Sequence, residues 1–100
     1  MTAKVLITRR CKEGESNNVF SCLKKLRTLA MEQPGYITGE SLLGYHDPEK
    51  ILVIGTWQSV ENWLAWKDNS ERTQEEARLQ QYLTSPTEYE IFVLGARPVK

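Results

Sequence analysis

Residues 51–66 read Ile51-Leu-Val-Ile-Gly-Thr-Trp-Gln-Ser-Val-Glu-Asn-Trp-Leu-Ala-Trp66, and this stretch passes from a strand pattern directly into a helix pattern. In residues 51–57, apolar side chains occupy both the odd-numbered and the even-numbered positions, and many of them are β-branched. This is typical of a strand covered on both faces. Ser59 is a favourable N-cap for the helix that follows. Trp63 and Trp66 lie three residues apart, so they project from neighbouring positions on one side of that helix. The stretch therefore predicts a strand whose end lies beside two indoles.

On the N-terminal side, the sequence predicts a strand, a long helix and a second strand. Residues 3–10 alternate weakly and are rich in Val, Leu, Ile and Thr, as in a strand. From 17 to 33, apolar residues recur at helical spacing, and the Pro-Gly pair at 34–35 should end this helix. Residues 36–45 read as a strand, which the turn sequence at 46–50 joins to the strand at 51–57. These two strands should form a hairpin.

On the C-terminal side, two short helices and a last strand are predicted. The helix from Val60 should end near residue 68, and Ser70 can cap another helix that ends at Ser85-Pro86. The inward side of this last helix should consist of Ala77, Leu79, Tyr82 and Leu83. Residues 88–95 read as a strand, and residues 96–100 as a loose tail.

The element order β-α-β-β-α-α-β predicts an α+β, ferredoxin-like fold with the helices on one face of an antiparallel four-stranded sheet. We expect a single domain over residues 1–100, with its core at about 3–95. The other sheet face carries apolar residues that the helices cannot reach, and a large exposed apolar face is unusual for a monomer. A second copy is the simplest cover, so the pattern predicts a homodimer in which two sheets meet.

The composition excludes several classes of function. Thirteen Lys and Arg side chains balance 13 Asp and Glu in the 100 residues, so we expect neither nucleic acid nor a membrane surface as a partner. No apolar run approaches the length that spans a bilayer, and no early segment reads as a secretion signal, which predicts a cytoplasmic protein. Cys11, Cys22 and His46 offer no set of metal ligands at useful spacing.

Taken in this order, the elements resemble the antibiotic biosynthesis monooxygenase domain family, whose members are dimeric α/β barrels. The resemblance covers about residues 3–95. The motifs that carry it are the helix stop at 32–36, the Asp-Pro hairpin at 47–48, the strand exit at 56–59, and a series of aromatic and basic residues, Trp57, Trp63, Trp66 and Arg72.

The resemblance implies an enzyme that oxidises a polycyclic phenol, anthrone or quinol with O2, without metal or flavin, in a pocket between helices and sheet. An electron-rich phenolate can pass an electron to O2 itself, so the protein need only orient the substrate and stabilise charge. Asn62 would hydrogen-bond a substrate oxygen, Trp66 would stack on the ring or donate its N–H, and Arg72 would stabilise a phenolate or superoxide. Trp63 and Tyr82 would contact the substrate.

Departures from the family keep two alternatives open. Many small quinol-oxidising relatives carry a histidine where this chain has Trp66, so an obvious general base is missing and a non-catalytic binding or sensing dimer is the second hypothesis. The third is a haem-binding or haem-degrading protein. That branch of the family uses an asparagine where this chain has Ile7 and a histidine near Glu75 or Glu76, so only the match at Trp66 remains.

Each candidate residue also has a purely structural interpretation. The indoles of Trp63 and Trp66 can simply fill the core, since large aromatic side chains dominate cores. Arg72 can be an exposed residue that pairs with an acidic side chain three or four positions on, because residues 71–78 read as a solvated helix face. His46 lies in a turn sequence, where a solvated side chain is the usual outcome.

Overall fold

The structure is a computed structural model that describes residues 1–95, and it has the predicted element order. The predicted tail at 96–100 lies outside these residues. The elements are β1 (Ala3–Arg10), α1 (Ser16–Ala30), β2 (Tyr36–Leu43), β3 (Lys50–Trp57), α2 (Val60–Lys67), α3 (Ser70–Gln80) and β4 (Glu88–Val93).

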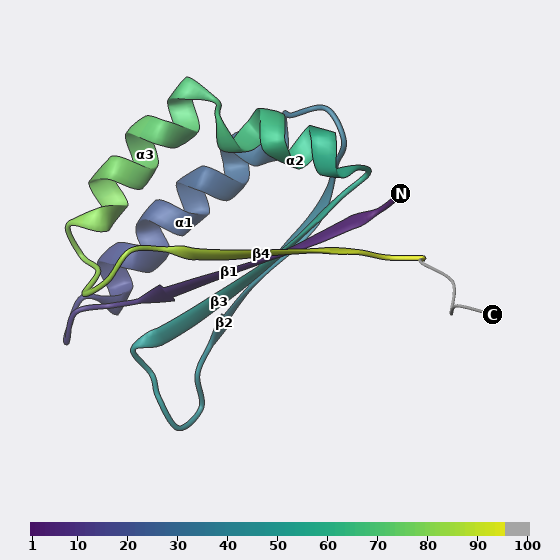
Figure 1. The fold of residues 1–100 in the computed structure, drawn as a ribbon. Coiled ribbons are helices and arrows are strands. Elements are labelled where there is room, and N and C mark those ends of the chain that lie inside the picture. Colours follow the sequence, from purple (N-terminus) through teal and green to yellow (C-terminus); the bar gives the residue numbers. More distant parts are fainter. Residues whose placement is uncertain (96–100) are drawn as a thin grey trace.

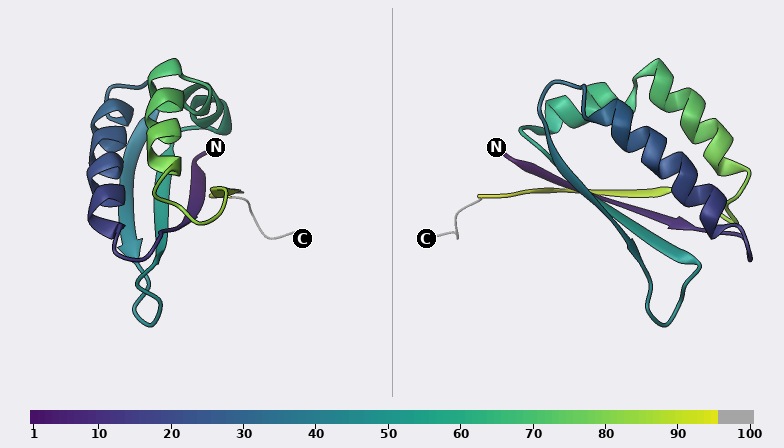
Figure 2. Two further views of the ribbon diagram at one scale, coloured as in Figure 1. Left: turned by 90° about the vertical axis from the view of Figure 1, so that its left-hand side faces the viewer. Right: turned by 180° about the vertical axis from the view of Figure 1, so that it is seen from behind.

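The four strands form one antiparallel sheet in the order β2-β3-β1-β4 (Figure 1). In β1, Ala3 pairs with Trp57 and Arg9 pairs with Ile51, so every second residue of both strands points to the same face. All three helices lie on that face, and the opposite face has no helix over it (Figure 2). The fold is therefore the predicted ferredoxin-like α+β arrangement.

The core lies between the helix layer and the sheet. The strand β1 alternates between buried and half-buried residues, and its helix-facing set contains an arginine at the last position, Arg9. The buried apolar side chains include Val5, Ile51, Trp57, Trp63 and Leu79. Two free cysteines, Cys11 and Cys22, are buried in the same core. Within residues 1–95, no helix is long and apolar enough to cross a membrane, and no cluster of His, Cys, Asp or Glu side chains could hold a metal ion.

Several element ends differ from the predicted ones. Helix α1 ends at Ala30 rather than at residue 33, and β2 ends at Leu43 rather than at residue 45. Ser70 is the first residue of α3 rather than its cap, because the side chain of Asn69 accepts hydrogen bonds from the first free backbone N–H groups of this helix. Either residue type can cap a helix, so the sequence alone did not separate these neighbours.

The uncovered sheet face mixes apolar and charged side chains. The apolar ones come from all four strands: Leu6, Leu42, Leu52, Ile54 and Phe92. Phe92 is half exposed and Leu42 is also exposed. These side chains leave apolar surface uncovered on the side away from the helices.

Candidate functional site

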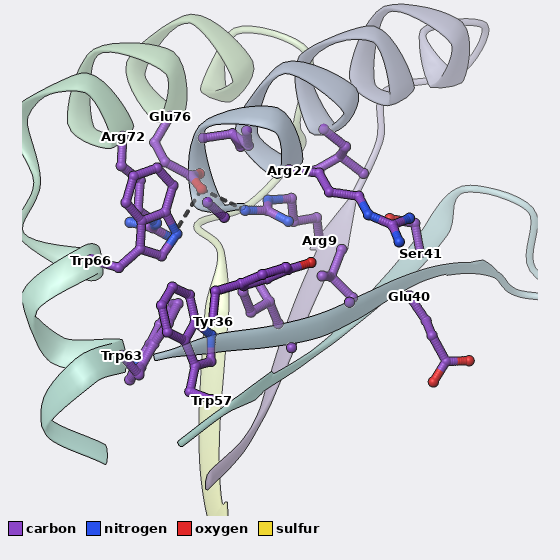
Figure 3. A pocket seen from close by; sticks show the side chains of 17 residues that line it. Arg9, Arg27, Tyr36, Glu40, Ser41, Trp57, Trp63, Trp66, Arg72 and Glu76 are labelled. Atoms are coloured by element: carbon purple, nitrogen blue, oxygen red, sulfur yellow. Dashed lines mark hydrogen bonds and ion pairs between the residues drawn. The ribbon is translucent and has the colours of Figure 1, made fainter. Parts of the chain in front are cut away.

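A cavity lies between α1, the helix-facing side of the sheet, and the pair α2 and α3 (Figure 3). Its volume is about 70 Å³. The inner walls are apolar and aromatic, and the charged groups gather where β1 faces α3. Arg27 lines the cavity as an exposed side chain at its rim, whereas the side chain of Glu40 points away from the cavity toward the uncovered sheet face (Figure 3).

Four aromatic side chains from β2, β3 and α2 line the cavity: Tyr36, Trp57, Trp63 and Trp66. The rings of Tyr36 and Trp57 meet edge to face with centroids 5.2 Å apart, and those of Trp57 and Trp63 lie 6.1 Å apart. All three indoles are buried. Such contacts hold each ring in one orientation, so the wall is a rigid surface on which a flat ring can pack.

The start of α2 is held against the start of β2, and this contact positions the indoles. Ser59 caps α2 by accepting from the backbone N–H of Asn62 at 3.1 Å, and its hydroxyl donates to Asn62 Oδ1 at 2.7 Å. The amide group of Asn62 lies directly over Gly35, leaving no room for a Cβ there. The backbone N–H of Gln58 donates to the Gly35 carbonyl at 2.7 Å. Gly35 also has φ +83°, which glycine adopts without strain.

Two buried arginines and one carboxylate form the polar side of the cavity. The Nη2 atoms of Arg9 and Arg72 lie 2.6 and 3.0 Å from the same oxygen, Glu76 Oε2. Figure 3 shows the three side chains converging from β1 and α3. Both guanidinium groups are buried, and the Glu76 side chain is 16% exposed. In so little water these charges interact more strongly than they would at the surface.

Arg72 is held in place by further contacts. Its Nη2 donates to the Tyr89 hydroxyl at 2.8 Å, and its Nη1 donates to the Lys67 carbonyl at 3.3 Å. Its guanidinium carbon lies 5.3 Å from the centre of the Trp63 ring and 5.5 Å from that of Tyr89, within the range of a cation–π interaction. Arg72 is therefore fixed between an aromatic wall and a carboxylate.

The prediction that residues 71–78 form a solvated helix face is wrong at three positions. Arg72 and Glu75 are buried, and Glu76 is half-buried. The expected inward residue Ala77 is exposed instead. The cause is that α3 turns its polar side toward the arginine of β1, so charged residues occupy its inner face. Arg72 does pair with the acidic side chain four positions on, but it does so away from solvent.

Three of the five predicted site residues line one cavity, and two lie outside its lining. Trp63, Trp66 and Arg72 meet there. Asn62 is engaged at the cap of α2, and Tyr82 is half-buried just beyond α3, where its carbonyl accepts from the Lys12 backbone N–H. The roles assigned to these five residues remain predictions.

Sequence reasoning did not find Arg9 or Glu76. The signal for Arg9 was its position in the alternation of β1. Ala3, Val5 and Ile7 precede it at every second residue, on the same face, and all three are buried. Glu76 lies near the position where the resemblance places a histidine, but nothing local in the sequence marks its partner, 67 residues away. Within the described chain no histidine lines the cavity, and His46 is exposed in the β2–β3 loop.

Comparison with known proteins supports the fold. No family model matches the sequence, and no curated protein matches it. Among solved structures, SnoaB, a cofactor-independent oxygenase from Streptomyces nogalater, is similar with a TM-score of 0.81 at 15% identity, over 99% of this chain and 97% of that one. An antibiotic biosynthesis monooxygenase gives a TM-score of 0.82 at 14% identity, over 96% and 99%. A conserved protein from Methanosarcina mazei gives 0.86 at 15% identity, over 92% and 91%. The chain thus has the fold that the sequence resemblance predicted.

Proposed function

We propose that this protein is a cofactor-independent monooxygenase that oxidises a phenol, anthrone or quinol with O2. One observation carries the proposal: a rigid aromatic wall and two buried arginines line one cavity of a fold shared with SnoaB, a cofactor-independent oxygenase. The flat surfaces suit an aromatic ring, and the arginines suit the oxygen of that ring once it is ionised.

In this reaction the protein would need only to position the substrate and to stabilise negative charge. An ionised phenol passes an electron to O2, and the resulting pair combines within the cavity. Trp63 and Trp66 would hold the ring, and Arg72 would stabilise the negative charge on the phenolate and on reduced oxygen. Arg72 is already fixed by Tyr89 and Glu76, so it need not reorganise during the reaction.

The size of the cavity favours a compact member of this substrate class. A volume of about 70 Å³ is well below the roughly 300–1,000 Å³ of sites that enclose drug-sized ligands. A one-ring or two-ring phenol needs less rearrangement than an anthrone, which would have to displace the exposed rim side chain of Arg27.

A non-catalytic binding domain is the second candidate, and the cavity lining favours it in one respect. Among the described residues that form the lining there is no histidine, the side chain whose ordinary pKa suits proton transfer near neutral pH. Such a domain would bind an aromatic ligand and change its tryptophan fluorescence without consuming O2.

Oxygen uptake separates the two candidates. The purified protein, freed of metal, would be assayed against catechols, naphthoquinols and anthrones, beside Trp66→Phe, Asn62→Ala and, as a control in the exposed hairpin loop, Tyr45→Phe. We expect uptake above the autoxidation rate in wild type and Tyr45→Phe, with a loss of about tenfold or more in Trp66→Phe. Ligand binding without uptake across the panel would favour the binding domain.

We also propose a homodimer formed through the uncovered sheet face, in a cytoplasmic protein. Support for the dimer comes from the apolar side chains left on that face, and the unpaired thiols suit a reducing compartment. Light scattering coupled to size exclusion should give a dimer, and Ile54→Lys in the middle of the face should give a folded monomer. The control Glu61→Lys, exposed on α2, should stay dimeric. A monomeric wild type at micromolar concentration would refute the dimer.

A further inference from the structure

We propose that the cavity binds its substrate as an anion, with an ionised oxygen of an aromatic ligand facing the guanidinium groups of Arg9 and Arg72. This inference names the substrate class for the proposed function and rests on that function for turnover. It depends on three observations: the charge buried at the cavity, the unpartnered Nε–H donor of Arg9, and the flat aromatic walls.

The first observation is an unbalanced positive charge. Arg9 and Arg72 are buried and carry two positive charges, whereas Glu76 supplies one negative charge, which leaves a net charge of +1. Of the two further charged residues of the lining, Arg27 is exposed at the rim, whereas Glu40 pairs with Ile54 and points to the uncovered sheet face, so it does not neutralise this charge. Two buried positive charges that share one carboxylate are only partly balanced, and buried charge is costly unless it is balanced, so the site favours an incoming anion.

The second observation is that Arg9 has hydrogen-bonding capacity to spare. Its Nη2 donates to Glu76 at 2.6 Å, while its Nε–H is buried and has no partner within residues 1–95. Arg72, by contrast, already contacts a hydroxyl, a backbone carbonyl and a carboxylate. Buried arginines normally use their donors. An oxyanion at Arg9 would supply the missing acceptor.

The third observation limits the shape of the anion. The indoles of Trp63 and Trp66 line the same cavity as Arg9, so the charged oxygen must belong to a flat apolar body. Aromatic carboxylates and phenols acidic enough to ionise near neutral pH share this chemistry. Inorganic phosphate lacks the apolar part, and a neutral quinol lacks the charge.

Calorimetry under anaerobic conditions tests the charge preference without turnover. The probes, all at pH 8.5, are 4-hydroxybenzoate, 4-nitrophenolate, and 4-methylbenzamide, which stays neutral at this pH. We expect at least one anion to bind about tenfold or more tightly than the amide, because charge-assisted hydrogen bonds are about twice as strong as neutral ones. Tight binding of 4-hydroxybenzoate alone would identify a carboxylate as the charged group of the ligand, and tight binding of 4-nitrophenolate alone would identify a phenolate. Equal binding of all three probes would overturn the inference.

Two variants with opposite expected effects exclude a merely structural explanation. Arg9→Met should weaken binding of the anion about tenfold and leave the amide unchanged, whereas Glu76→Gln removes the neutralising carboxylate and should strengthen anion binding. The control Arg10→Met alters the next arginine, which pairs with Asp47 on the exposed hairpin side, and should change neither. Circular dichroism checks folding. If Arg9→Met does not fold, anion binding by Glu76→Gln is the deciding measurement. Weaker anion binding in Glu76→Gln than in wild type would overturn the inference.

Failure of this inference and failure of the proposed function give different results. Anion-selective binding without O2 uptake would refute the monooxygenase and leave the anion site standing. Uptake with a neutral quinol, combined with equal binding of the charged and neutral probes, would refute the anion site and leave the monooxygenase standing.

Discussion

Replacing Gly35 by alanine should destabilise the protein through two separable effects. Its φ of +83° is unfavourable for alanine, which costs about 1–2 kcal/mol. A Cβ at this position would also collide with Cγ and Oδ1 of Asn62 and lie 2.7 Å from its Cβ. Relieving such an overlap costs about 1–3 kcal/mol. The free energy of unfolding should therefore fall by about 2–5 kcal/mol in Gly35→Ala.

Gly14 is a matched control, because it separates backbone strain from collision. It has φ +79° and no atom within 4 Å of an added Cβ. Gly14→Ala should thus lose only the backbone term of about 1–2 kcal/mol. The reduced freedom of the unfolded chain that alanine brings is common to both variants and cancels in the comparison.

Urea unfolding followed by tryptophan fluorescence measures the difference, at one fixed protein concentration since a dimer would make stability concentration-dependent. The double variant Gly35→Ala with Asn62→Ala removes the two colliding atoms beyond Cβ, so the two substitutions should be coupled favourably by about 0.5–3 kcal/mol. If Gly35→Ala costs no more than Gly14→Ala, the packing of Asn62 on Gly35 does not position α2, and the reasoning is wrong.

Three further predictions concern other parts of the fold. Ser59→Ala removes the N-cap of α2 and should lower the free energy of unfolding by about 1 kcal/mol, as urea titration would show. Burial raises the pKa of the Cys11 and Cys22 thiols, so the native protein should react with iodoacetamide at pH 8 far more slowly than the unfolded chain. Because the folded thiols hold their protons to higher pH, their contribution to stability is complete below the pKa of an ordinary thiol and is lost above it. The hydrogen bond from Arg10 lowers the pKa of the Asp47 carboxyl, and an NMR titration of Arg10→Met should show the Asp47 midpoint moving up.

The order and type of the elements were predictable because they depend on local patterns. Residues 51–57 and 60–67 show the change from strand to helix within one short stretch, and Ser59 marks the boundary. The spacing of Trp63 and Trp66 likewise predicted neighbouring indoles, and both line the cavity. Helix and strand periods repeat every few residues, so the sequence alone contains this information.

The charged part of the site was decided by the tertiary structure. Arg9 and Glu76 are 67 residues apart and meet only because β1 lies in the middle of the sheet and α3 packs across it. The same packing turns a helix face that looks solvated in the sequence into the inner wall of a cavity, and it directs the Asn62 amide onto Gly35. Local periodicity shows which residues share a face. Which face meets which depends on contacts between distant segments, and those contacts decide where charge can be buried.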